Sequence, residues 1–233
     1  MKTDSAQYYD LIYSFKDYDR EADEIIRILE GQNSECQTIL DVGCGTHELV
    51  KGLTKRFKVD GIDLCDVSIS IAEEKNPDGN YSVGDMRSFD LGRQYDALIC
   101  LSSSIGYLAD YEDLVKTAEC FSKHIKLGGL LVIEPWYFPE TWKAGKVAMV
   151  KGGDQDVKIA RASTRVSRGT DSVVTFHFMV AQNNRVEYFV EEHHLKLFSK
   201  RQINEAFENV GFNMAHSFDW SRGRGLFVGK LEH

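Results

Sequence analysis

Between residues 36 and 135 the chain alternates apolar segments of strand length with segments of helical length, and this alternation constrains the fold more than any other feature. The runs ILDV, ALICL and LLVIE are typical of parallel strands that are buried on both faces. Strands that alternate with helices form a parallel sheet with right-handed crossover connections. We therefore predict an α/β fold, with strands at 37–42, 58–64, 80–84, 95–101 and 128–136 and helices near 47–56, 66–75 and 110–125.

The pattern changes after Pro135. The following segment contains four runs rich in β-branched residues, KVAMV, VKIARASTRV, VVTFHFMVA and VEYFVEEHHLKLF, with the turn signals GGDQ, SRGTD and QNN between them. Such runs predict an antiparallel sheet. Ser199 is expected to cap a helix that reaches about residue 210, Gly211 to end it, and strands near 212–218 and 225–230 to follow. We thus expect one domain, residues 1–233, with a doubly wound, Rossmann-like core in residues 1–144 and 199–230 and an inserted antiparallel lid in residues 145–198.

The composition excludes several classes of protein. The formal net charge of −8 disfavours a polyanionic partner, so nucleic acid is not expected as a substrate. The five cysteines form no CxxC pair, which favours free thiols in a reducing cytoplasm over a disulfide framework or a zinc site. The first ten residues lack the apolar core of a signal peptide, and no apolar run approaches the ~18 residues of a membrane span. We expect a cytoplasmic protein without a membrane partner.

The segment Glu191-Glu192-His193-His194 contains residue types that bind metals. Adjacent residues on a strand point to opposite faces of the sheet, so these side chains cannot easily share one ion. No metal site is therefore expected.

The segment TILDVGCGTHE, residues 38–48, carries the most informative chemistry. A strand is expected to end at Asp41 and Val42, and Gly43-Cys44-Gly45 to form the turn at which open parallel sheets bind ligands, because glycine lets the backbone turn tightly and approach a ligand. A dinucleotide-binding loop would have the pattern GxGxxG, but position 48 is not glycine. The pattern DVGCGT is instead typical of S-adenosylmethionine binding, in which Asp41 helps to neutralise the cofactor's ammonium group. A turn that binds no ligand is the alternative.

Three further strand ends fit the same cofactor. Asp63, followed by Leu64, lies 22 positions after Asp41 (63 − 41), near the roughly twenty-residue spacing expected for a ribose-binding carboxylate. Asp85 is expected to accept from the adenine amino group, with Met86 against the ring. In the loop after the fourth strand, Leu101 and Ser102 are expected to contact the cofactor and Ser104 the substrate.

Beyond these motifs, the chain resembles a known family almost from end to end. Residues 37–135 carry the general pattern of class I S-adenosylmethionine-dependent methyltransferases. More narrowly, the chain is similar to the TDP-3-amino-sugar N,N-dimethyltransferases of deoxysugar biosynthesis, which complete desosamine and mycaminose. The similar stretches are YYDLIY, KDYDREA, DVGCGT, NPDG, GDMRSFDLG, SSSIGYL, GGLLVIEPWYFPE, VEEHHLKLFSKRQINEAF and GRGLFVG.

The resemblance implies a homodimer that binds a TDP-sugar, with Tyr9 and Tyr18 over the cofactor and Arg224 reaching the nucleotide diphosphate. A guanidinium suits phosphate oxygens, although a surface arginine in a turn is the alternative. The chain departs from the family at His47, where the family has glycine, and at Tyr107, where it has histidine. The second departure leaves the acceptor open.

Methyl transfer from a sulfonium ion requires alignment of the reacting atoms more than it requires a strong base, and positioning supplies on the order of 7–11 kcal/mol. Tyr107 is the candidate for contacting the acceptor amine. Glu134, Trp136 and Tyr137 are expected to form the acceptor pocket, with packing against the lid as the alternative for the two aromatic residues.

The leading hypothesis is an N-methyltransferase for a small amine, best a nucleotide-linked amino sugar, with S-adenosylhomocysteine as product. The alternatives are another amine, hydroxyl or carboxylate acceptor, a non-catalytic S-adenosylmethionine-binding protein, and a dinucleotide-dependent oxidoreductase.

Overall fold

A computed structural model describes residues 3–217, 220 and 224–233. Its core is a seven-stranded sheet in the order β10-β11-β5-β4-β1-β2-β3. The strands are β1 (Thr38–Val42), β2 (Lys58–Asp63), β3 (Tyr81–Val83), β4 (Tyr95–Cys100), β5 (Ile125–Ile133), β10 (Phe212–Ser217) and β11 (Leu226–Leu231). Strands β1 to β5 pair in parallel, whereas β11 pairs antiparallel with β5 and with β10. The predicted α/β core is confirmed.

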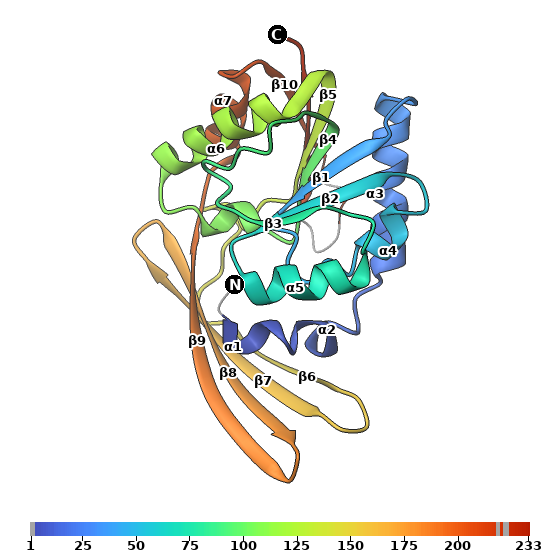
Figure 1. The fold of residues 1–233 in the computed structure, drawn as a ribbon. Helices are drawn as coiled ribbons and strands as arrows, with labels where there is room; N and C mark the ends of the chain where they lie inside the picture. Colours follow the sequence, from blue (N-terminus) through green and yellow to red (C-terminus); the bar gives the residue numbers. More distant parts are fainter. Residues whose placement is uncertain (1–2, 218–219, 221–223) are drawn as a thin grey trace.

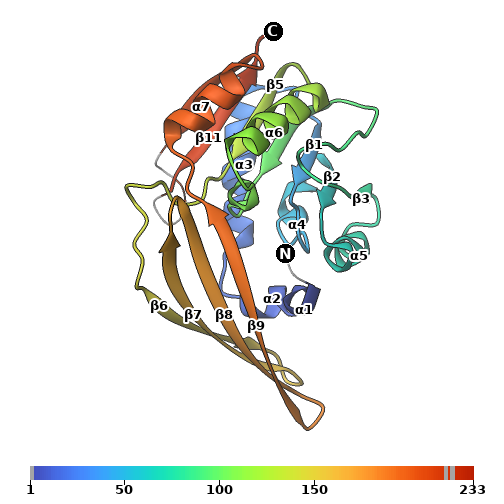
Figure 2. The same ribbon diagram turned by 90° about the vertical axis from the view of Figure 1, so that its left-hand side faces the viewer.

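Helices cover both faces of this sheet (Figures 1 and 2). The helices are α1 (Thr3–Ala6), α2 (Tyr9–Ile12), α3 (Tyr18–Gln32), α4 (Val50–Leu53), α5 (Asp66–Lys75), α6 (Tyr111–His124) and α7 (Lys200–Glu208), with a 3₁₀ turn, η1, at Ser104–Tyr107. One face packs on α6 and α7 through buried residues such as Phe121 and Phe207. The other packs on α3 and α4 through residues such as Ile25 and Leu53.

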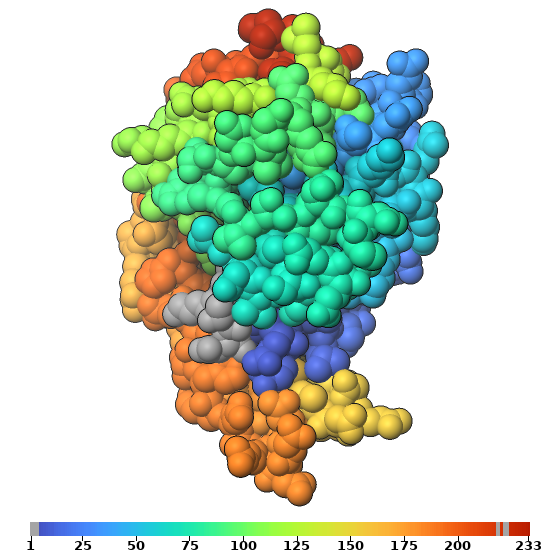
Figure 3. All heavy atoms as spheres, viewed as in Figure 1, coloured from blue at the N-terminus to red at the C-terminus, as the bar shows by residue number. Residues whose placement is uncertain are grey.

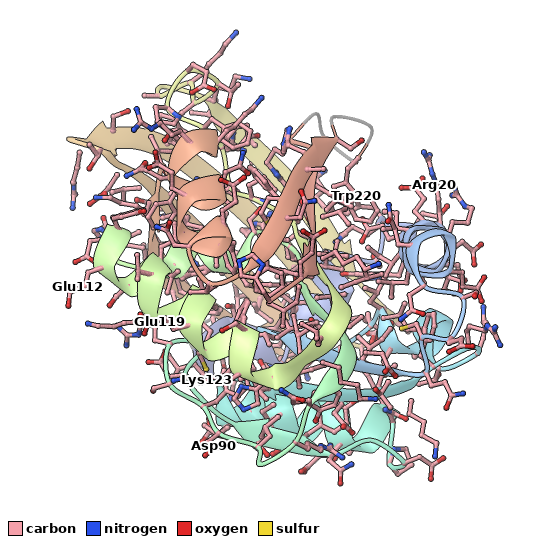
Figure 4. The ribbon with its side chains drawn as sticks, turned by 90° about the horizontal axis from the view of Figure 1, so that it is seen from above. Arg20, Asp90, Glu112, Glu119, Lys123 and Trp220 are labelled. Carbon is pink, nitrogen blue, oxygen red and sulfur yellow. The ribbon has the colours of Figure 1, made fainter. Side chains whose placement is uncertain are left out.

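The polar sides of these helices face the solvent. Seen from above, Glu119 and Lys123 of α6 lie on one side of the molecule and Arg20 of α3 lies on the other (Figure 4). All three side chains are exposed. The helices are therefore amphipathic, with their apolar sides on the sheet and their polar sides in solvent. The carboxyl ends of the strands remain free to form a site.

The lid is a separate four-stranded antiparallel sheet in the order β6-β7-β8-β9. Its strands are β6 (Val147–Gly153), β7 (Lys158–Arg168), β8 (Asp171–Gln182) and β9 (Arg185–Lys196). The N-terminal helices join the lid to the core, because Tyr8 and Ile12 pack on the lid residues Ile159, Phe178 and Val180. Figure 3 shows this N-terminal segment between α5 and the lid strands.

Helix α7 begins and ends as expected. Ser199 Oγ accepts from Gln202 N while the Gln202 side chain binds the Ser199 backbone, which is a capping box. Gly211 follows with a φ of +98°.

The predicted helix at 47–56 is wrong in extent, because only Val50–Leu53 is α-helical. His47 has a φ of +55°, in the left-handed region, which is incompatible with a right-handed helix at that position. The fifth strand also differs from the prediction, since it runs from Ile125 to Ile133.

Candidate active site

A cavity of about 640 Å³ lies among the ends of the core strands, the N-terminal segment and one face of the lid. Fifteen of the predicted site residues line it: Tyr9, Tyr18, Asp41, Gly43, Cys44, Gly45, Asp63, Leu64, Asp85, Met86, Leu101, Ser102, Ser104, Tyr107 and Trp136. Three do not: Glu134, Tyr137 and Arg224. The expected cofactor and acceptor residues therefore mostly share one space.

The glycine loop is a tight turn held by the neighbouring strand. Gly43 and Gly45 have φ values of +73° and +56°. The amides of Gly43 and Cys44 both donate to Ile62 O, at 2.8 and 3.0 Å. A Cβ on Gly43 would lie 2.7 Å from the Cβ of Ser104. Position 43 thus requires glycine for both its backbone conformation and its close packing.

Asp63 fastens this loop to the end of β2. Its Oδ2 accepts from Gly45 N and its Oδ1 from Cys65 N, each at 2.8 Å. The side chain is buried, yet each carboxylate oxygen retains capacity for one more hydrogen bond. Asp63 can therefore hold the loop and accept from ribose hydroxyls together.

Asp41 has a neighbour that the sequence did not reveal. Its Oδ2 lies 3.1 Å from His47 Nε2, in a geometry that does not form an aligned hydrogen bond. His47 Nδ1 is 2.7 Å from Tyr81 Oη. The Tyr81 hydroxyl oxygen accepts a hydrogen bond from Asn76 Nδ2 at 3.0 Å. Because Tyr81 then has its own proton to donate to Nδ1, the His47 proton belongs on Nε2, beside Asp41.

Tyr9 and Tyr18 border the cavity from the N-terminal segment. Burial, together with Tyr13, Tyr18 and other acidic neighbours, raises the pKa of Tyr9 well above its ordinary value. Burial also raises the pKa of Tyr18, whose buried hydroxyl has no hydrogen-bond partner among the described residues. Both tyrosines are therefore neutral phenols at the cavity wall, and the Tyr18 hydroxyl oxygen itself is buried.

Asp85 forms an ion pair that the sequence did not predict. Arg87 binds Asp85 through Nε and Nη2, and its Nη1 donates to Asp113 Oδ2 at 2.8 Å. Hydrogen bonds from Arg87 hold the pKa of Asp85 below its usual value. Asp85 is therefore a carboxylate acceptor at the cavity wall, next to Met86.

Glu134 and Arg224 form an ion pair beside the aromatic residues that follow β5. Both are buried, so the alternative of a surface position for Arg224 is wrong. Glu134 also accepts from Ser102 N at 2.8 Å. The guanidinium lies 5.6 Å from the ring centroids of both Trp136 and Tyr137.

The aromatic residues after β5 lie between the core and the lid. Trp136 Nε1 donates to Ser172 Oγ of β8 at 2.7 Å, so Trp136 packs against the lid while its surface lines the cavity. The guanidinium of Arg165 lies 5.7 Å from the Tyr137 ring. Burial opposes ionisation of Tyr137, but Arg165 and Arg224 outweigh it and lower the pKa of the phenol.

Sequence reasoning missed a chain of hydrogen bonds behind Tyr107. Tyr107 Oη lies 2.6 Å from His193 Nδ1, and His193 Nε2 lies 3.2 Å from Glu191 Oε2. Ser5 donates to Glu191 through its amide at 3.1 Å and its hydroxyl at 2.8 Å. The alternation of β9 was the available signal, since it places Glu191 and His193 on the face that lines the cavity.

The neighbouring His194 points the other way, as the alternation predicts. It is exposed and binds Glu192 at 2.7 Å.

Within residues 3–217, 220 and 224–233, no group of three side chains has the arrangement of a metal site. No helix in that part of the chain is long and apolar enough to span a bilayer. The cysteines are free thiols, and four of them are buried.

Comparison with known proteins identifies the family. A family model described as a methyltransferase domain matches residues 13–217. The chain belongs to this methyltransferase family. It is 35% identical, over 98% of both chains, to dTDP-3-amino-3,4,6-trideoxy-alpha-D-glucopyranose N,N-dimethyltransferase of Streptomyces venezuelae. It also resembles the crystal structure of Streptomyces venezuelae DesVI, with a TM-score of 0.92, 35% identity and coverage of 98% of this chain and 99% of that one.

A second solved structure adds the cofactor. S-adenosylmethionine-bound CalS10, an amino pentose methyltransferase from Micromonospora echinaspora, has a TM-score of 0.86 and 28% identity to this enzyme, over 99% of this chain and 97% of that one. The enzyme is an S-adenosylmethionine-dependent methyltransferase, as the glycine loop predicted. Its residues fit the cofactor, because Asp63 lies at the cavity and both of its carboxylate oxygens can accept a further hydrogen bond.

Proposed function

We propose that the enzyme methylates the amino group of a nucleotide diphosphate-linked sugar, such as a TDP-amino sugar. One observation carries the proposal. The glycine loop and Asp63 open into the same lid-covered cavity as Tyr107 and Trp136, so a cofactor and an acceptor can meet there. The activity of the Streptomyces venezuelae relative, an amino-sugar N,N-dimethyltransferase, supports the choice of an amino sugar.

The charges beside the cavity support a diphosphate on the acceptor. Arg165 and Arg224 flank Tyr137, and Glu134 is paired with Arg224. No described carboxylate lies within ion-pair distance of Arg165, so this cluster retains one positive charge. A guanidinium fork beside an aromatic ring suits phosphate oxygens and a nucleotide base.

The protein acts in this proposal by holding the reactants in line. When bound, S-adenosylmethionine supplies an electrophilic methyl group. The glycine loop and Asp63 fix one end of the cavity, and Tyr107 orients the acceptor amine at the other. The lid and Trp136 exclude water, which strengthens the alignment effect.

We further propose a homodimer that works in the cytoplasm. The outer face of the lid exposes several apolar side chains, among them Met149, Met179, Val186 and Tyr188. Such a surface is typical of a protein–protein contact. Light scattering tests the dimer: a mass of one chain would reject it. Free, buried cysteines are typical of the reducing cytoplasm.

The acceptor is tested by incubating the enzyme with S-adenosylmethionine and TDP-sugars that carry an amino group at different ring positions. We expect S-adenosylhomocysteine to form and the sugar to gain methyl mass. Turnover on an unrelated amine alone would reject the amino-sugar acceptor but keep the reaction. Binding of the cofactor without turnover on any acceptor would indicate a non-catalytic protein.

A further inference from the structure

We propose that Tyr107, His193 and Glu191 form a proton relay that deprotonates the acceptor amine before methyl transfer. The inference rests on the proposed function only in requiring an amine acceptor, whether or not that amine belongs to a sugar. Tyr107 is the group that meets the substrate, His193 is the proton acceptor, and Glu191 is a positioning residue that acts through His193.

The first support is geometric. Tyr107 comes from η1, directly after the core strand β4, whereas His193 and Glu191 come from the lid strand β9. The Oη–Nδ1 distance of 2.6 Å and the Nε2–Oε2 distance of 3.2 Å connect the three side chains across the gap between core and lid. Tyr107 retains 47% exposure although protein surrounds it, because its ring borders the cavity.

The second support is that the hydrogen bonds of Glu191 determine which nitrogen of His193 carries the proton. Glu191 is 1% exposed and accepts two hydrogen bonds from Ser5. Burial alone would raise the pKa of Glu191, but the hydrogen bonds from His193 and Ser5 outweigh burial and lower it. Glu191 is therefore a carboxylate and takes the Nε2 proton of His193, which leaves Nδ1 as an acceptor for the Tyr107 hydroxyl.

The surroundings of the relay contain few competing charges. Among the described residues at the cavity, the titratable groups nearest to the relay are Tyr9 of α2, Tyr13 after α2, Arg161 of β7 and Asp63 of β2. Arg161 Nη1 binds Tyr13 Oη at 2.9 Å, and its guanidinium lies over Phe176, whose ring is 4.9 Å from that of His193. Burial, Tyr13, Glu191 and Asp63 all raise the pKa of Tyr107, so the phenol passes a proton on rather than staying ionised.

The proton transfer balances without another reactant. The acceptor arrives as an ammonium ion, and one N–H proton moves to Tyr107 Oη as the Tyr107 proton moves to His193 Nδ1. One N–H bond breaks and one N–H bond forms on the imidazole. The amine gains a free lone pair, and the positive charge comes to rest on His193 beside the Glu191 carboxylate. The imidazolium returns the proton to water when the product leaves.

The relay is tested with His193→Asn, because the asparagine oxygen can still accept from Tyr107 but cannot take a proton. We expect kcat at pH 7 to fall about 100-fold, the lower end of the range for proton transfer by a positioned side chain. The loss should shrink above about pH 9, where an amine with a pKa near that of an α-amino group, about 8, is already neutral. The matched control is His194→Asn, on the opposite face of the same strand, which should retain wild-type kcat.

Glu191→Gln provides a second readout, with Glu192→Gln as its control. The variant removes the charge that stabilises the imidazolium, so the acid limb of the kcat–pH profile should move to lower pH while cofactor affinity by calorimetry stays unchanged. In the ligand-free protein, ¹⁵N NMR should find the wild-type His193 proton on Nε2. A proton on Nδ1 would overturn the relay.

Two further outcomes would also overturn the relay. One is a His193→Asn loss that is equal at every pH, since that indicates a structural role. The other is wild-type kcat in His193→Asn at pH 7. Failure of the amino-sugar proposal is distinguishable, because it appears in the wild type as turnover on a different amine, on which the same variants can be measured.

Discussion

The buried pair of Glu134 and Arg224 yields a prediction about stability. Arg224→Leu would leave the Glu134 carboxylate with one described donor, Ser102 N at 2.8 Å. The two side chains are only 5% and 9% exposed, so solvent cannot replace the guanidinium. Removing one partner of a buried pair costs about 3–5 kcal/mol in the free energy of unfolding. For a chain of this size that loss lowers Tm by about 6–20 °C.

The assay is thermal and urea unfolding of three variants. Glu134→Gln combined with Arg224→Leu should recover at least half of the loss, because the amide is neutral and can still accept from Ser102. Arg201→Leu is the control, since its pair with Glu205 is exposed to solvent and should contribute little to stability. The reasoning is refuted if Arg224→Leu matches this control in stability, and a raised KM for the TDP-sugar would then assign Arg224 to the diphosphate alone.

Three smaller predictions follow from local geometry. Gly43→Ala should lower stability and cofactor affinity more than Gly92→Ala, because both have positive φ but only the Gly43 methyl would collide with Ser104; equal urea midpoints would contradict this. Despite burial, hydrogen bonds from its partners hold the pKa of Asp96 below its usual value, so it adds stability above about pH 4 that is lost as pH falls through the lowered pKa. Asp96→Asn should flatten that decline below about pH 5; an unchanged slope would argue against it. Ser199→Ala should cost about 0.5–2 kcal/mol in unfolding free energy, and no loss would reject the capping box.

The sequence predicted the fold well where the signal is local. Continuous apolar runs predicted the parallel strands, and the switch to alternation predicted the four lid strands. The Ser199 cap and Gly211 were also visible, because a cap depends on residues a few positions apart. The helix after β1 was predicted too long because His47 has a left-handed φ and contacts Asp41 and Tyr81, and neither feature leaves a pattern in the sequence.

The candidate site was predicted less evenly. Motif residues such as Asp63 and Tyr107 line the cavity, because strand ends of a parallel sheet necessarily converge. The partners of these residues could not be read from the sequence. Glu134 meets Arg224 from 90 positions away, and Tyr107 meets His193 from 86 positions away. The first pair forms within the core, where β11 pairs with β5, and the second forms where the lid packs on the core.

The central claim is that the glycine loop and Asp63 bind S-adenosylmethionine. Calorimetric titration of S-adenosylhomocysteine into the wild type, Asp63→Ala and the exposed control Asp66→Ala measures it most directly. We expect binding to the wild type and the control, and an affinity at least about 10-fold weaker in Asp63→Ala, since a hydrogen bond to a charged group contributes about 1.5–3 kcal/mol. Equal affinity in all three proteins, or binding of NAD in place of S-adenosylhomocysteine, would contradict the account.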